Sequence, residues 1–215
     1  MKRLQVGVLV SGRGSNLQAI LDRSADGDIA VDVAVVVSDV EDAHALERAR
    51  RAGVPAVYLP PGRFRTRLDD EAERRYVETL DEHGVEVVAL AGFMRILHRG
   101  ILDRFAGRVV NIHPALLPSF PGLDAQRQAL EHGVKWTGAT VHFVDAGVDS
   151  GPIILQAAVP VADDDTLETL SARILEEEHR IYPEALDLIA RDRVSIEGRR
   201  VLIRRPEGAG EEPPA

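Results

Sequence analysis

Short apolar runs that alternate with amphipathic segments constrain the fold of this chain more than any other feature. Residues 4–10 and 31–37 are rich in valine and leucine, and each run is followed by a serine. The segment between them includes residues 15–25, which carry apolar side chains at helical spacing. Strands that are apolar on both faces and alternate with helices are typical of a parallel sheet covered on both sides.

The pattern continues along the chain and changes in the second half. Further strands are expected at residues 56–59, 85–91, 108–113, 140–144 and 153–161, and further helices at residues 43–52, 66–83 and about 166–191. The strands at 140–144 and 153–161 are too close in sequence for a helical crossover, which favours an antiparallel pair. We therefore predict an α/β fold with a Rossmann-like, mostly parallel open sheet, helices on both faces, and antiparallel strands in the C-terminal half.

The C-terminal part carries three local signals. Asp165 and Glu168 have the spacing of a capping box at the start of the long helix. Pro183 should kink that helix or break it in two, because proline has no backbone N–H. Residues 194–203 have the pattern of a terminal hairpin.

Composition limits the classes of protein to which the chain can belong. Its 215 residues suit one domain, expected over residues 1–205, and a Gly-, Pro- and Glu-rich tail over 206–215 that is expected to be disordered. Cysteine is absent, which excludes disulfides and thiolate chemistry, and we see neither a signal peptide nor a membrane-spanning apolar run. We therefore expect a cytoplasmic protein. The net charge of −9 argues against a nucleic-acid partner, and no histidine spacing indicates a metal site.

A glycine-rich turn follows the first expected strand. Gly12 and Gly14 let the chain turn sharply before a helix whose first N–H groups are free to bind an anion. Leu17 occupies the position of the third glycine in the dinucleotide fingerprint, which argues against binding of a nicotinamide dinucleotide. Asp39, after the second expected strand, is only weak evidence in favour of such binding. We therefore expect the turn to bind a phosphate group.

Polar side chains appear at the end of the strand expected at residues 108–113. Asn111 and His113 are two residues apart, so they project to the same side at the carboxyl edge, where open α/β sheets bind ligands. An amide and a protonated imidazole can both donate to a developing oxyanion, the imidazole can also move a proton, and the carboxylate of Asp149 in a Gly-rich turn can favour the protonated imidazole. The set indicates acyl transfer onto an amine, although a lone strand-end histidine is more often structural and an aspartate in a turn is by default a turn-former. His142, on a later strand, is either a second member of this site or a core histidine.

Four segments of the chain together resemble one family. They are residues 12–20, 90–97, 111–118 and 141–156. In this order, over residues 4 to about 195, they are similar to the folate-dependent phosphoribosylglycinamide formyltransferases of purine synthesis. The resemblance implies the substrates glycinamide ribonucleotide and 10-formyltetrahydrofolate, the latter as a co-substrate, and no metal.

The resemblance also implies roles for individual residues. The catalytic trio is matched by Asn111, His113 and Asp149. The ribonucleotide site is matched by Gly14, Ser15, Asn16 and Glu178. The folate site is matched by Arg67, Met94, Arg95, Ile96, Leu97, Asn111 and Asp145. Without the resemblance, the acidic run around Glu178 would be interpreted as a solvated helix face. The N-terminal half is thus expected to bind the ribonucleotide phosphate, and the C-terminal half to supply the folate loop.

Three residues depart from the family pattern. Asp124 and Gln126 stand where many relatives carry two histidines, and Trp136 stands where a smaller residue is expected.

Methionyl-tRNA formyltransferase and formyltetrahydrofolate hydrolase share the Asn-x-His and Asp signals, but those enzymes carry extra domains, and a tRNA enzyme should be basic. A non-catalytic nucleotide-binding module is the alternative from another class, and it leaves the polar set unexplained. A homodimer is compatible with the predicted fold, and no sequence feature decides it.

Overall fold

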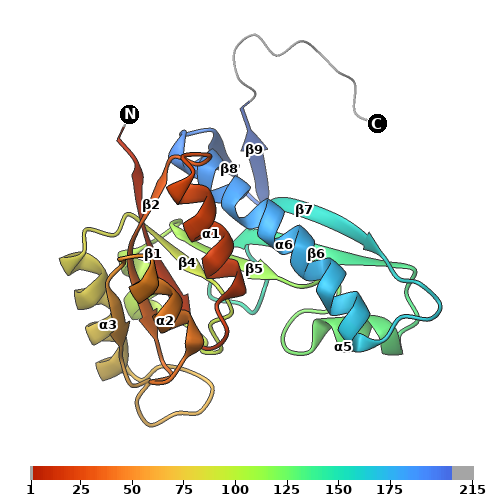
Figure 1. Cartoon of the computed structure of the whole chain (residues 1–215), viewed down its shortest axis with the longest axis horizontal. Coiled ribbons are helices and arrows are strands. Elements are labelled where there is room, and N and C mark those ends of the chain that lie inside the picture. Colours follow the sequence, from red (N-terminus) through yellow and green to blue (C-terminus); the bar gives the residue numbers. More distant parts are fainter. Residues whose placement is uncertain (1, 205–215) are drawn as a thin grey trace.

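The computed structural model describes residues 2–204 and shows an open sheet covered by helices (Figure 1). The seven strands of the main sheet are β1 (Leu4–Val10), β2 (Val31–Ser38), β3 (Ala56–Tyr58), β4 (Val87–Leu90), β5 (Val109–His113), β6 (Trp136–Phe143) and β7 (Ile153–Pro160). The helices are α1 (Ser15–Ala25), α2 (His44–Arg51), α3 (Asp70–Glu82), α4 (Arg99–Arg104), α5 (Ala125–Glu131) and α6 (Leu167–Ala190). The predicted terminal hairpin is formed by β8 (Val194–Glu197) and β9 (Arg200–Ile203). The predicted tail at 206–215 lies outside the described residues.

The strand pairing confirms the predicted fold class. The order across the sheet is β3-β2-β1-β4-β5-β6-β7. The pairs from β3 to β5 are parallel, whereas β6 is antiparallel to both β5 and β7. The order reverses direction at β1, so the carboxyl ends of β1 and β4 border a topological switch point, where open sheets bind ligands. The loops after these strands touch there, because Ser11 N–H donates to the Gly92 carbonyl at 3.2 Å.

Two apolar cores lie on opposite faces of the sheet. Helices α1, α2 and α6 cover one face, where Ile20 and Tyr182 are fully buried. Helices α3 and α4 cover the other face, where Tyr76 is fully buried. The hydroxyl of Tyr182 lies 2.9 Å from the Leu90 carbonyl and 3.1 Å from the Val110 carbonyl. The long helix α6, which runs along the sheet in Figure 1, is therefore fixed against the ends of β4 and β5.

Helix α3 begins later than predicted because the residues before it pair with another loop. Ile96 N–H donates to the Thr66 carbonyl at 2.9 Å, and Arg67 forms a β-bridge with Ile96. The helix then starts at a side-chain cap, since the Asp69 carboxylate accepts from the N–H of Ala72 at 2.9 Å. The bridge brings two segments of the predicted folate site side by side.

Helix α6 differs from the prediction at its start and in its middle. Its N-cap is Thr166, which forms a capping box with Thr169, so the predicted pairing of Asp165 with Glu168 was wrong. The Asp165 carboxylate instead accepts from the hydroxyl of Thr169 at 2.8 Å. Of the kink or break expected at Pro183, the break does not occur, because the helix packs against α1, β6 and β7 and continues where the proline removes one backbone hydrogen bond.

Strand β6 is longer than predicted, since it begins at Trp136 rather than at Thr140. Gly138 lies in the added part, where a Cβ atom would be 1.9 Å from the carbonyl oxygen of Ala157 on β7. A glycine inside a strand weakens the sequence signal for that strand, which explains the shorter prediction. Helices α4 and α5 were not predicted because segments this short show no clear helical period. None of the helices within residues 2–204 combines the length and apolarity needed to cross a membrane.

Candidate active site

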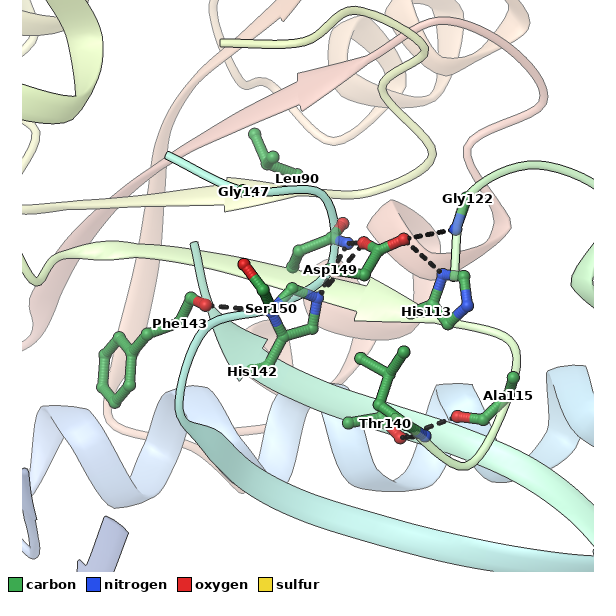
Figure 2. Close-up of polar contacts among 12 residues, drawn as sticks. Leu90, His113, Ala115, Gly122, Thr140, His142, Phe143, Gly147, Asp149 and Ser150 are labelled. Atoms are coloured by element: carbon green, nitrogen blue, oxygen red, sulfur yellow. Dashed lines mark hydrogen bonds and ion pairs between the residues drawn. The ribbon is translucent and has the colours of Figure 1, made fainter. Parts of the chain in front are cut away.

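Strand β5 and the loop between β6 and β7 bring the predicted trio together. Asn111 Nδ2 lies 3.4 Å from Asp149 Oδ1, and His113 Nδ1 lies 3.4 Å from Asp149 Oδ2. The backbone of Asp149 has a φ of 49°, a left-handed conformation that aspartate adopts more readily than most residues. Figure 2 shows its carboxylate pointing toward the ring of His113. The structure thus places an amide, an imidazole and a carboxylate around one point.

His142 is the fourth side chain of this cluster. It lies directly opposite Asn111 in the antiparallel pairing of β5 with β6. Its Nε2 atom is 3.2 Å from Asn111 Nδ2 and 3.5 Å from Asp149 Oδ1, and its side chain is only 2% exposed. Of the two interpretations that the sequence left open, the structure supports membership of the site.

Two backbone groups from the loop after β5 complete the cluster. Gly122 N–H donates to Asp149 Oδ2 at 2.8 Å, and His113 Nε2 lies 2.8 Å from the carbonyl oxygen of Phe120 (Figure 2 shows the first contact). Sequence reasoning missed both, because a backbone group carries no residue-type signature. The only local signal was the turn-forming pair Pro121-Gly122.

The carbonyl partners decide which nitrogen of each ring carries a hydrogen. A carbonyl only accepts, so His113 Nε2 donates to Phe120, and in the neutral ring the Nδ1 atom that faces Asp149 has a free lone pair. By the same argument, His142 Nδ1 donates to the Phe143 carbonyl at 2.9 Å and its Nε2 is bare in the neutral ring. Two bare nitrogens therefore face the carboxylate, and a proton that arrives on either is held by an ion pair.

Burial sets the charge state of the cluster. Burial lowers the pKa of His113 below its ordinary value of 6.5, and the nearby His142 lowers it further. The charge of Asp149 and the hydrogen bond to the Phe120 carbonyl raise this pKa but do not outweigh the burial. Burial alone would raise the pKa of Asp149, but a hydrogen bond from His142, the Gly122 N–H and the charge of His113 hold it below 3.8, the two ring contributions acting when the rings carry a proton. Near neutral pH, Asp149 is therefore charged and His113 is neutral, so burial works against the cationic His113 that was expected as a second oxyanion donor beside Asn111. Within residues 2–204, no group of three or more His, Cys, Asp or Glu side chains is arranged to hold a metal ion.

The glycine-rich turn leads into α1 as predicted. Gly14 is the N-cap with a φ of 71°, and Ser15 is the first helical residue. The first turn of α1 contains no acidic residue, so its free N–H groups can receive an anion. Asn16 faces inward instead, where its Nδ2 donates to Glu178 Oε2 at 2.8 Å. The turn thus presents free N–H groups at the start of α1 and, through Asn16, a polar contact to α6.

Gly14 should tolerate no side chain. A Cβ atom would lie 2.6 Å from the Cβ of Ala45, and alanine at this positive φ is strained as well. We expect Gly14→Ala to lower the free energy of unfolding by about 2–4 kcal/mol and to raise the KM of a phosphorylated substrate. Gly12→Ala is the matched control for stability, because its added Cβ meets nothing within 4 Å. Urea unfolding of both variants tests this, and equal stabilities would contradict it.

Glu178 lies in a buried corner between α1 and α6 rather than on a solvated face. The residue is 7% exposed, and burial raises the pKa of its carboxyl to about 7, against the hydrogen bond from Asn16. In the described part of the chain, the buried Oδ1 atom of Asn16 has no hydrogen-bond partner. An unpaired acceptor beside a carboxyl group suits a ligand that brings N–H donors.

The predicted folate residues 94–97 lie on the loop between β4 and α4. Met94 and Ile96 are 58% and 49% exposed, whereas Leu97 is buried in the core beneath α3 and α4. Leu97 can therefore contact a ligand only through its backbone. Arg67 lies beside Ile96, and its guanidinium stacks on the ring of Phe64 at 3.7 Å from the centroid.

Arg95 points inward and binds a buried carboxylate. Its Nε donates to Asp39 Oδ2 at 2.6 Å, while the hydroxyl of Ser11 donates to Asp39 Oδ1 at 2.6 Å. The same hydroxyl accepts from Met94 N–H at 2.8 Å, so the three side chains tie the glycine-rich turn to the 94–97 segment. Both oxygens of Asp39 are engaged, which removes the weak indication of a nicotinamide site.

Asp145 shapes the loop that carries Asp149. Its Oδ1 accepts from the N–H of Gly147 at 3.0 Å and from the hydroxyl of Ser150 at 2.6 Å. Asp145 therefore links Gly147 and Ser150, which lie on either side of Asp149 in the loop. Asp145 itself is exposed, and the structure places its carboxylate in these loop contacts rather than in the cluster.

Exposed apolar side chains border the polar cluster. Leu123 follows Gly122 and is 75% exposed, and Val148 precedes Asp149 and is 57% exposed. Together with the exposed side chains after β4, they give three neighbouring loops an apolar surface. Apolar walls around a few convergent polar groups are typical of a small-molecule site.

The residues that depart from the family pattern lie outside the cluster. Asp124 is the N-cap of α5 with a φ of 57° and makes no side-chain capping bond, and Gln126 lies in the first turn of that helix. Trp136 is 61% exposed at the start of β6, opposite Pro160. Nothing in the structure explains the tryptophan.

Comparisons with known proteins identify relatives over nearly the whole chain. The model of a family described as formyl transferase matches residues 4–186, which include every residue of the cluster. Phosphoribosylglycinamide formyltransferase of Escherichia coli is 44% identical over 193 residues, which cover 90% of this chain and 90% of that protein. The human trifunctional purine biosynthetic protein adenosine-3 is 44% identical over 195 residues; the match covers 91% of this chain and 19% of the human protein. A crystal structure of glycinamide ribonucleotide transformylase 1 from Symbiobacterium toebii is 57% identical, with a TM-score of 0.91 and 95% of each chain covered.

Proposed function

The chain belongs to the formyl transferase family, and on that premise we propose that it transfers a formyl group from 10-formyltetrahydrofolate to the primary amine of N1-(5-phosphoribosyl)glycinamide. This reaction is a step of de novo purine (IMP) biosynthesis. The observation that carries the proposal is the cluster at the carboxyl end of β5, where Asp149 lies 3.4 Å from both Asn111 and His113. A non-catalytic nucleotide-binding module would need only the glycine-rich turn, and it leaves this cluster without a purpose.

The ribonucleotide is bound between α1 and α6. Gly14, Ser15 and Asn16 receive its phosphate at the start of α1, which the absence of acidic residues in that turn supports. Glu178 and the unpaired oxygen of Asn16 face the glycinamide end, which brings N–H donors. The N-terminal half of the domain over residues 1–205 thus supplies the phosphate site.

The formyl-folate is bound on the other side of the cluster. The ring system lies against the backbone of residues 94–97 and the side chains of Met94 and Ile96, whose exposure supports an apolar contact. Arg67 borders the same segment, and its guanidinium pairs with a carboxylate of the folate, which the bridge to Ile96 supports. Asp145 contributes by holding the loop that closes on the folate from the C-terminal half.

His113 moves the proton of the attacking amine. When the amine attacks the formyl carbon it becomes positively charged and must lose a proton. The lone pair on His113 Nδ1 takes that proton, and Asp149 stabilises the resulting imidazolium. The ring then donates the proton to the folate nitrogen that leaves. A water held by Asp149 is the alternative route, and either route needs the charged carboxylate.

Asn111 stabilises the negative oxygen that forms on the formyl group. Its Nδ2 contact with Asp149 is 3.4 Å long, at the weak end of hydrogen bonding, so the amide can exchange it for the substrate oxygen. Loss of one such donor typically raises the barrier by about 3–4 kcal/mol.

Turnover with both substrates tests the proposal. The purified chain should form formylglycinamide ribonucleotide at a rate that depends on both compounds, and each compound should raise the melting temperature of the native protein. Release of formate without transfer to the amine would indicate a formyltetrahydrofolate hydrolase instead. The expected cytoplasmic location and the possible homodimer stay predictions.

A further inference from the structure

His142 has no role in the mechanism above, yet it contacts two of the three residues that have one. Its Nδ1 atom lies 2.9 Å from the Phe143 carbonyl, and its Nε2 atom lies 3.2 Å from Asn111 Nδ2 and 3.5 Å from Asp149 Oδ1. The residue is 1% exposed, so no solvent competes for these positions. Both ring nitrogens have polar partners, and the ring therefore has one orientation.

The partners of the ring favour one placement of its hydrogen. The Phe143 carbonyl accepts only, so Nδ1 carries a hydrogen. Asn111 Nδ2 donates only, and it lies closer to Nε2, at 3.2 Å, than Asp149 Oδ1 does, at 3.5 Å, so the contact with the amide requires a bare Nε2. If Nε2 carried a hydrogen, two donors would face each other, namely the ring N–H and the Asn111 NH₂ group. Asn111 would then have to turn its carbonyl oxygen toward His142.

The direction of the Asn111 amide matters for the reaction. Its NH₂ group stabilises an oxyanion, whereas its carbonyl oxygen repels one. One amide hydrogen points to His142 Nε2 at 3.2 Å, and the other makes the longer contact of 3.4 Å with Asp149. The second hydrogen is therefore the one that is free to pass to a substrate oxygen.

We propose that His142 is a positioning residue for the formyl transfer: its bare Nε2 holds one hydrogen of the Asn111 amide and so presents the other to the reacting oxygen. This inference rests on the proposed function. The titratable groups that face the ring are Asp149 from the β6–β7 loop and His113 from β5. A hydrogen on Nε2 would point to the Asp149 carboxylate and release the amide, so the proposed contact needs a bare Nε2.

Nitrogen-15 NMR of the full chain tests the geometry without any substitution in the measured protein. Two-bond proton–nitrogen correlations of labelled histidines should show His142 as the Nδ1–H tautomer and His113 as the Nε2–H tautomer at the pH of maximal activity. Spectra of His142→Gln and His113→Ala assign the two signals. A hydrogen on Nε2 of His142, in a neutral or a cationic ring, would overturn the inference.

Kinetics of matched variants test the function of the contact. Glutamine places an acceptor oxygen near the position of Nε2, so His142→Gln should stay within about threefold of the native kcat, whereas His142→Leu should lose roughly tenfold, the upper range for one neutral hydrogen bond. The KM for glycinamide ribonucleotide should not change, because the ring is proposed to act only on the Asn111 amide. His83→Leu, at the end of α3, is the control and should leave kcat unchanged. Equal losses in the Gln and Leu variants, or an effect on KM alone, would contradict the role.

The outcomes separate this inference from the function on which it rests. Absence of formyl transfer by the native chain rejects the proposed function, whatever the tautomer of His142. Normal transfer by the native chain with a hydrogen on His142 Nε2 rejects the positioning role alone. If His142→Leu does not fold, the tautomer and the glutamine variant still decide the question.

Discussion

Asp149→Asn is expected to lower kcat by about 10²–10⁴-fold, the usual contribution of general acid–base catalysis. The carboxylate is the group that favours a proton on His113, against the burial that lowers the pKa of that ring. An uncharged amide cannot oppose the burial, so the pKa of His113 should fall further. The imidazolium that forms during the reaction then loses its counter-ion, and the barrier rises.

The pH dependence separates this effect from a loss of structure. In the variant, the acid limb of the kcat/KM profile that reports His113 should move to lower pH, because the pKa of the ring is lower. Asp164→Asn removes an exposed carboxylate at the start of the α6 region and serves as the charge-matched control, with unchanged kcat. An Asp149→Asn profile that superimposes on the native one would show that the carboxylate and the ring are not coupled.

Glu178→Gln is expected to stabilise the protein at alkaline pH while it weakens ribonucleotide binding. Burial raises the pKa of Glu178 from 4.5 to about 7, so the folded state keeps its proton up to about pH 7 and the unfolded chain releases it near 4.5. The native protein therefore loses stability as pH rises through that window, by roughly 3 kcal/mol when the shift is converted at 1.36 kcal/mol per unit. Glutamine does not ionise and can still accept from Asn16.

Urea unfolding at pH 5 and pH 8 measures this difference. The variant should match the native chain near pH 5 and exceed it by about 2–3 kcal/mol at pH 8. Its KM for glycinamide ribonucleotide should rise, because the charged acceptor for the amine is gone. Glu176→Gln on the exposed side of α6 is the matched control and should change neither quantity. If the variant is no more stable than the native chain at pH 8, then ionisation of Glu178 does not destabilise the native fold, and the prediction is wrong.

The sequence predicted the elements and side chains whose signal is carried by residue type and period. The apolar runs located the strands of the sheet, and the two-residue spacing of Asn111 and His113 predicted that both reach one side, where Asp149 meets them. The antiparallel pairing in the second half followed from the short connection between its strands. Burial on both faces makes these signals strong, because every residue of such a strand must be apolar.

The remaining parts depend on backbone groups and tertiary contacts that residue type does not show. The contacts of Phe120 and Gly122 with the cluster come from main-chain atoms in a turn. The start of α3 was set by pairing with a distant loop, and the continuity of α6 through Pro183 by packing on the sheet. His142 could be placed in the site only once its pairing with Asn111 across two strands was known.

Turnover by His113→Ala tests the central claim most directly, because that claim assigns the proton transfer to one ring at the end of β5. We expect the native chain to transfer the formyl group and the variant to be slower in kcat by at least about 100-fold, while both substrates still raise its melting temperature. Retained ligand binding shows that the variant is folded and that the loss lies in the chemistry. Full activity of His113→Ala with both substrates would contradict the account.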